Sequence, residues 1–110
     1  MAKTSSASTF SRRSTDLGQL SGIGRAMLGD FELLGIKSVA QLARRNPDRL
    51  YDQLCERTGQ RHDICVLDTL RCAVAQARDP DLPAERRQWW WWSRQRKAGH
   101  RFAGTWDAER

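Results

Sequence analysis

Two glycines flank one isoleucine in the stretch LSGIGRAM, residues 20–27, and an arginine follows them directly. Glycine loses more conformational entropy on folding than any other residue, so paired glycines indicate a tight turn or a close approach of the backbone. Amides at such a turn, where a helix begins, can bind a phosphate group, which the positive end of the helix dipole also attracts. The candidate phosphate-binding residues are therefore Gly22, Ile23, Gly24 and Arg25. A tight helix connection that binds nothing is the alternative explanation.

A second candidate site is the stretch RRQWWWWSRQRK, residues 86–97. Four consecutive tryptophans cannot all lie on one side of a helix or strand, so we expect at least one or two to be partly exposed. Exposed tryptophan rings stack on bases, and arginines neutralise phosphates. We expect Trp89 and Trp92 to close the core. The auxiliary nucleic-acid contacts that we predict are Arg86, Arg87, Trp90, Trp91, Arg94, Arg96 and Lys97. An interfacial membrane helix is disfavoured because the segment lacks aliphatic residues.

Soft metal ligands are present, but their spacing is not that of a zinc finger or knuckle. They are Cys55, His62, Cys65 and Cys72. Cys65 and Cys72 are separated by about 10 Å along one predicted helix, which is too far for a disulfide. We expect reduced thiols that pack as small apolar side chains, and no metal. A Cys55–Cys65 disulfide, or a metal site on His62 and Cys65, remains an alternative.

The sequence does not support catalysis. Asp63 and Asp68 lie five residues apart, and Asp79 and Asp81 flank a proline, so neither pair resembles a carboxylate dyad. No phosphate loop or nucleophile elbow is present. We expect Arg71 to pair with an acid such as Asp68, or with a helix-end carbonyl, rather than to act on a substrate. We predict no catalytic residue and no enzymatic activity.

The composition fits one basic domain of 110 residues, 39% apolar and 29% charged, with a net charge of +6. No apolar run approaches the roughly 20 residues of a transmembrane helix, so we expect a cytoplasmic protein without membrane contact. Both ends are basic, and residues 14–85 carry slightly more acids than cations. We expect four segments: a disordered tail at 1–13, a helical domain at 14–80, a Trp/Arg-rich segment at 81–97 that packs on or extends this domain, and a flexible basic tail at 98–110.

Helix start and stop signals divide the central domain into five predicted helices. A short helix runs from Ser14 or Asp16 to about Leu20, and a second covers residues 25–34 before a left-handed stop at Gly35. The third covers residues 38–45 behind a capping box of Ser38 and Gln41, the fourth begins at Asn46 and Pro47, and the fifth covers residues 64–78 behind Asp63. The fifth carries an apolar stripe of Ile64, Leu67, Leu70, Val74 and Ala77. No sustained alternation of period two occurs, so we predict an all-α fold, a compact bundle of about five helices.

The stretch LSGIGRAMLGDFELLGIKSVAQL resembles a helix-hairpin-helix DNA-binding motif. The longer pattern RNPDRLYDQLCERTGQRHDICVLDTLRCAVAQA, with the tryptophan cluster, resembles a small bacterial "pathogenicity locus" family, some of whose members carry the name mitomycin resistance protein. The resemblance covers roughly residues 15–97. It implies a helix-hairpin-helix fold, phosphate contacts at the glycine pair, and room for a monovalent cation on backbone carbonyls. Ser21 stands where the motif usually has proline, and Leu28 where it prefers alanine.

These features together predict a DNA-binding protein that contacts phosphates and does not read bases, because phosphate contacts carry no direct sequence information. DNA repair or damage tolerance is the physiological context that the family's name suggests. One alternative is a protein-interaction module that keeps the fold without DNA binding, because the body is acidic and the motif departs at two positions. A redox or metal sensor built on the cysteines is a further alternative.

Overall fold

The computed structural model describes residues 16–102 and residue 106, and over these residues it is helical without strands. The five α-helices are α1 (Arg25–Leu33), α2 (Val39–Leu42), α3 (Pro47–Thr58), α4 (Ile64–Arg78) and α5 (Trp89–Lys97). Two 3-10 helices, η1 (Asp16–Gln19) and η2 (Ala84–Arg87), complete the set. The predicted all-α fold is confirmed. The predicted tail at 1–13 and the proposed cap at Ser14 lie outside the described residues.

The predicted helix ends are confirmed where side chains or glycines define them. Ser38, Asn46 and Asp63 each cap a helix by accepting hydrogen bonds from backbone N–H groups of the first turn. Gly35 has a φ of 75°, and the Ile36 N–H donates to the Phe31 carbonyl at 2.9 Å, as in a Schellman ending. These local interactions explain why helices of modest length begin and end at the positions that the sequence predicts.

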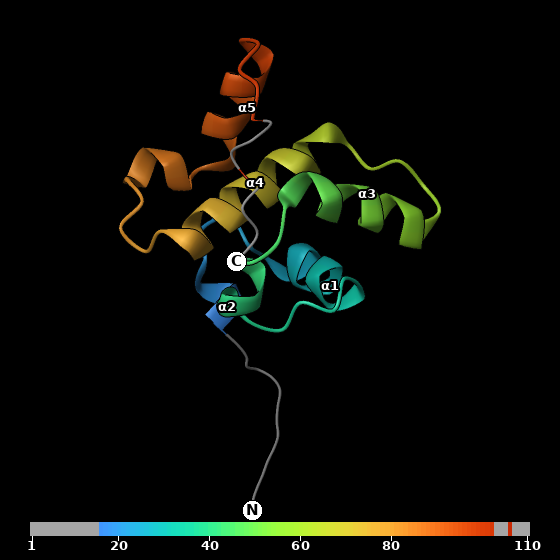
Figure 1. Ribbon diagram of the computed structural model, residues 1–110. Coiled ribbons are helices and arrows are strands. Elements are labelled where there is room, and N and C mark those ends of the chain that lie inside the picture. The colour runs from blue at the N-terminus through green and yellow to red at the C-terminus, as the bar shows by residue number, and fades with distance from the viewer. Residues whose placement is uncertain (1–15, 103–105, 107–110) are drawn as a thin grey trace, which may run out of the picture.

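Helix α4 lies at the centre of the molecule (Figure 1) and contacts α2, α3, α5 and η2. Its residues Leu70, Ala73 and Val74 are fully buried. Burial extends around much of the helix and includes the polar residues Asp68 and Gln76. A helix surrounded in this way must satisfy its buried polar groups internally, because water does not reach them. The two polar residues therefore fix how neighbouring elements lie against α4.

Three expectations about the helices need correction. The first predicted helix is the four-residue 3-10 helix η1, and the fifth α-helix is α5, formed by the tryptophan segment. The third helix is shorter than predicted and ends at Leu42, with residues 43–45 in turns and a bend. Ile64, the first residue of the predicted apolar stripe, is 42% exposed, and the buried part of the stripe begins one turn later at Leu67. In the part of the chain that the structure describes, no helix combines the length and apolarity needed to cross a membrane.

Candidate nucleic-acid interface

The hairpin, residues 20–25, turns the chain from η1 into α1. Gly22 has a φ of 81°, a left-handed conformation that disfavours any residue with a Cβ atom. The Ile23 N–H donates to the Leu20 carbonyl at 3.3 Å, and the Ile23 side chain is buried in the core. Gly24, in contrast, has an ordinary φ of −102° and is the N-cap of α1. The turn is therefore anchored by one inward side chain, while both glycines stay exposed.

The start of α1 is open to solvent and has no side-chain cap. The first N–H groups of any helix have no acceptor within the helix. At α2, α3 and α4 a side chain accepts some of these bonds, whereas Gly24 has no side chain to do so. Arg25 is exposed beside them, and within the described residues it forms no ion pair. The four predicted residues therefore lie together, with amides, helix dipole and one cation at the same place.

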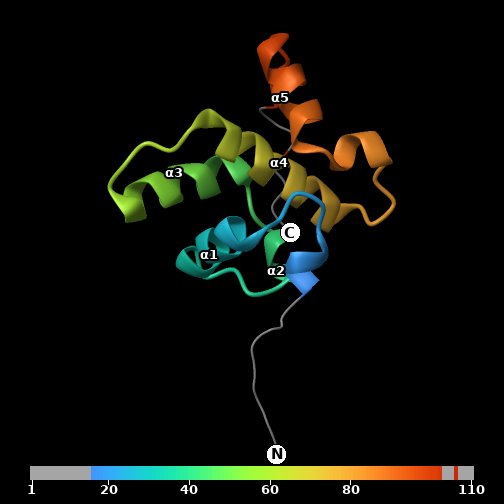
Figure 2. The same ribbon diagram turned by 180° about the vertical axis from the view of Figure 1, so that it is seen from behind.

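Gln76 is a residue at the hairpin that the sequence analysis missed. Its side-chain amide bonds to both backbone groups of Ser21, which precedes the glycine pair. Figure 2 shows the hairpin passing across the C-terminal part of α4, where Gln76 lies. A glutamine near the end of a long helix carries no sequence signal for such a contact, because its partner is 55 residues away.

The tryptophan segment, residues 86–97, places its four indoles in different surroundings. Trp92 is buried, and its Nε1 donates to the Arg86 carbonyl at 2.8 Å. Trp91 is half-buried and meets Trp92 edge to face, with ring centroids 5.0 Å apart. Trp90 is 39% exposed and Trp89 is 41% exposed. The expectation that Trp89 helps to close the core is wrong, because Trp89 is exposed and Trp92 is the buried one of the four tryptophans.

The arginines of this segment differ in what they contact. Arg96 forms two hydrogen bonds, of 2.9 and 2.8 Å, with the fully buried carboxylate of Asp68. These bonds raise the pKa of Arg96 and keep it charged. The Arg94 guanidinium lies over the Trp90 ring at 4.6 Å, and that of Arg86 lies over Trp91 at 5.3 Å. Arg96 thus points into the protein, while Arg94 stays at the surface.

Comparison with known proteins identifies the family of this chain. The family model described as "Pathogenicity locus" matches residues 11–98, which is most of the chain. This chain belongs to the pathogenicity locus family. It is also similar to the mitomycin resistance protein McrB of Streptomyces lavendulae, with 44% identity over 70 residues. That match covers 64% of this chain and 65% of the relative, so the chain spans just under two thirds of it. No solved structure matches.

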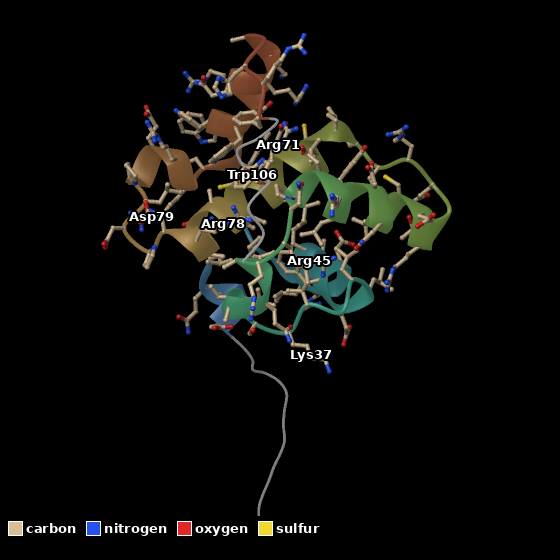
Figure 3. The ribbon with its side chains drawn as sticks, in the orientation of Figure 1. Lys37, Arg45, Arg71, Arg78, Asp79 and Trp106 are labelled. Atoms are coloured by element: carbon tan, nitrogen blue, oxygen red, sulfur yellow. The ribbon has the colours of Figure 1, made fainter. Side chains whose placement is uncertain are left out.

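The aromatic residues Phe102 and Trp106 lie beyond the part of the chain that the family model matches, yet both are buried. The ring centroids of Phe102 and Trp106 lie 5.3 and 5.9 Å from that of Trp92. Figure 3 shows Trp106 between Arg71 and Arg78, and the Arg78 guanidinium lies 5.4 Å from its ring centroid. Phe102 and Trp106 are therefore part of the core, although they fall in the segment for which we expect a flexible basic tail.

Arg71 pairs with an acid, as expected, but that acid is Asp48 and not Asp68. Arg71 donates two hydrogen bonds to one carboxylate oxygen of Asp48 on α3, at 3.1 and 2.9 Å, and stacks on Phe102. Asp68 is instead the partner of Arg96. Residues three apart on a helix can pair, but both side chains here reach other elements. In this family member, the two ion pairs therefore tie α4 to α3 and to α5.

The three cysteines are free thiols in different environments. Burial raises the pKa of Cys72 to about 11. The sulfur of Cys55 accepts a hydrogen bond from the His62 N–H at 3.4 Å, and the His62 ring contacts the hydroxyl of Thr58. Among the described residues, no three His, Cys, Asp or Glu side chains gather as metal ligands. The geometry here gives neither the disulfide nor the metal alternative any support.

Proposed function

We propose that this protein binds DNA through a helix-hairpin-helix element formed by η1, the hairpin and α1, without reading base sequence. The uncapped N-terminus of α1 carries this proposal. Its amides, the helix dipole and the Arg25 side chain would bind one backbone phosphate. Neutral backbone groups supply most of this contact, so it does not depend on the net charge of the body of the protein.

The space around the two glycines supports the proposal. A Cβ atom added at Gly22 or Gly24 would meet no other atom within 4 Å, so the turn is open on its outer side. The glycines are therefore not required by internal crowding. At Gly22 the positive φ accounts for glycine, but Gly24 has neither a positive φ nor a close neighbour. Glycine is a favourable N-cap residue, and close approach of a phosphate to the backbone is a second physical reason for glycine there.

The tryptophan segment supports an additional contact. Trp89 and Trp90 are exposed, Arg94 stacks on Trp90, and residues 86–97 contain no acidic residue. Aromatic rings beside unpaired cations suit unstacked bases and phosphates. Of the residues predicted there, Arg96 is the weakest candidate, because Asp68 holds its guanidinium. The DNA-repair or damage-tolerance context rests on the name of the relative, a mitomycin resistance protein.

The test is an amide chemical-shift titration with a short DNA duplex and with one of its strands, at low and moderate salt. We expect shifts centred on Gly22, Gly24 and Arg25, and weaker binding at higher salt because phosphate binding releases counterions. Arg25→Glu should lower duplex affinity about tenfold and reduce the salt slope by about one. Lys37→Glu is the matched control, since Lys37 follows the opposite end of α1 and is also exposed.

Each outcome has a definite meaning. Shifts at the hairpin that Arg25→Glu weakens and Lys37→Glu preserves would support the phosphate site. Shifts confined to residues 86–101 would mean that the tryptophan segment binds and the hairpin is architectural. If neither region shifts at low salt, the proposal is wrong, and a protein-interaction module becomes the better explanation of the fold.

A further inference from the structure

Gln76 is a buried polar residue to which the proposed DNA contact assigns no direct role. We propose that Gln76 is the positioning residue of the hairpin, which holds the glycine turn in the conformation that presents its amides to phosphate. The inference rests on the proposed function, but it concerns a residue that would not touch the DNA. Gln76 is 8% exposed and lies in the last turns of α4.

The contact between Gln76 and the hairpin is a pair of hydrogen bonds through one planar group. Oε1 of Gln76 accepts from the Ser21 N–H at 2.9 Å, and Nε2 donates to the Ser21 carbonyl at 3.1 Å. Two bonds from a rigid amide fix both the position and the orientation of the residue they hold. Ser21 directly precedes Gly22, so this clamp acts on the peptide that enters the turn.

The identity of residue 21 fits this role. Proline, the usual residue here in the motif that the sequence resembles, has a fixed φ and no backbone N–H. Ser21 lacks that restraint but keeps the N–H that Gln76 binds. The restraint that a proline ring supplies locally is therefore supplied here from α4. Replacing Ser21 by proline would remove one of the two bonds.

The side chain of Gln76 is itself held in place. Its Nε2 lies 3.5 Å from the sulfur of Cys72, one turn earlier on α4. The Cys72 thiol donates toward the Arg86 carbonyl at 3.6 Å, and the same carbonyl accepts from the Trp92 indole. The orientation of the Gln76 amide is also determined, because a reversed amide would place donor against donor at Ser21. The clamp is thus part of a buried network that ends in the tryptophan segment.

The test replaces Gln76 with glutamate and measures duplex affinity between pH 5 and pH 8. A protonated carboxyl can accept from the Ser21 N–H and donate to the Ser21 carbonyl, as the amide does, whereas an ionised carboxylate cannot donate. Burial raises the pKa of a carboxyl, so the change of state should fall within this range. We expect Gln76→Glu to bind about tenfold more weakly than wild type at pH 8 and within about twofold at pH 5.

The controls separate the clamp from added charge and from other titrations. Gln60→Glu adds the same charge at an exposed site in the loop before α4, and wild type reports every native titration. Among residues 16–102 and 106, the titratable side chain bonded to Gln76 is the Cys72 thiol, whose pKa of about 11 lies outside the range measured. Equal affinity of Gln76→Glu and wild type at pH 8, or a loss that low pH does not reverse, would overturn the proposal.

A measurement without DNA separates this inference from the proposed function. In Gln76→Glu the amide shifts of Ser21, Gly22 and Gly24 should change with pH and return to the wild-type values at pH 5. Gln76→Leu should displace them at every pH. Such shifts in a protein that binds no duplex would uphold the clamp and overturn the DNA-binding proposal. If the amide shifts of these three residues do not change with pH in Gln76→Glu, Gln76 does not position the hairpin.

Discussion

The hairpin and the tryptophan segment are both candidate contact surfaces, but different kinds of interaction hold them in place. Backbone conformation, the buried Ile23 side chain and the Gln76 amide hold the hairpin. Large side chains that enter the core hold the tryptophan segment, chiefly Trp92 and the Arg96 ion pair with Asp68. Each region therefore contains anchoring residues, such as Ile23 and Trp92, and exposed groups, such as Arg25 and Trp90.

This difference shows that the density of cations along a sequence is a poor guide to the charge available to a partner. The tryptophan segment is the more basic of the two regions, yet Arg96 is neutralised by a buried carboxylate. The hairpin carries a single arginine, but its N–H groups and helix dipole add positive potential without formal charge. Substitutions of anchoring residues should accordingly lower stability, whereas substitutions of exposed groups in either region should affect binding.

The largest effect that we expect is on Trp92. Trp92→Ala removes a buried ring that contacts Trp91, Phe102 and Trp106, and should lower the free energy of unfolding by about 4 kcal/mol. Trp90→Ala, at an exposed position on the same helix, should change it by less than about 0.5 kcal/mol. Urea unfolding followed by circular dichroism measures both values.

The effect of Trp90→Ala on nucleic-acid affinity should be larger than its effect on stability. If Trp90 stacks on a base, Trp90→Ala should weaken single-strand binding by about 1–3 kcal/mol while leaving the fold intact. A large loss of stability in Trp90→Ala would show that the division into anchors and exposed groups does not hold within α5.

The next largest effect should follow removal of the Arg96 charge. Arg96→Met keeps much of the side-chain volume but leaves the Asp68 carboxylate buried without a partner, which should cost about 3 kcal/mol of stability. Arg94→Met is the matched control, because Arg94 is exposed and contacts the Trp90 ring. Denaturant titration of the two variants at pH 7 measures the difference. Equal stabilities would mean that the Asp68–Arg96 pair does not anchor α5.

Interactions within a few residues of sequence were predictable from it. The caps at Ser38, Asn46 and Asp63, and the left-handed stop at Gly35, are confirmed because each satisfies a backbone group close to it in the chain. The all-α fold follows, since such signals divide the chain into helices. The grouping of the four hairpin residues was predictable for the same reason, as they are consecutive.

Pairings between distant elements were not predictable. Arg71 had nearby candidates on its own helix but pairs with Asp48, and Gln76 meets a partner 55 residues away. Periodicity also failed to predict which tryptophan is buried, because consecutive residues in the run point about 100° apart around the helix. The packing of Phe102 and Trp106 against Trp92 decides it. One sequence carries no signal for which surfaces meet.

A smaller effect should separate the two glycines of the hairpin. Gly22→Ala places a Cβ atom at a φ of 81° and should cost about 1–2 kcal/mol of stability. Gly24→Ala has an ordinary φ and open space but replaces a favourable N-cap residue, so stability should fall by only about 0.5 kcal/mol. Duplex affinity should nevertheless fall in Gly24→Ala if a phosphate approaches the backbone there. Thermal unfolding and duplex titration of both variants test this, and unchanged affinity in Gly24→Ala would remove the main argument for a phosphate at that position.

The smallest effect concerns Cys72, which lies between the two regions and contacts the Gln76 amide and the Arg86 carbonyl. Burial raises its pKa to about 11, so at pH 10 the folded thiol stays neutral while the thiol of the unfolded chain ionises. The unfolded state then binds fewer protons than the folded state, and stability must fall as pH rises between the unfolded and folded pKa values. We expect the stability advantage of wild type over Cys72→Ala to shrink by about 1 kcal/mol from pH 8 to pH 10.

Denaturant titrations at both pH values measure this change in stability. Taking the difference between the two proteins cancels every other group that titrates alike in both. A parallel decline of the two proteins would mean that solvent reaches the thiol, and that the hairpin and the tryptophan segment are not joined through a closed interior at this point.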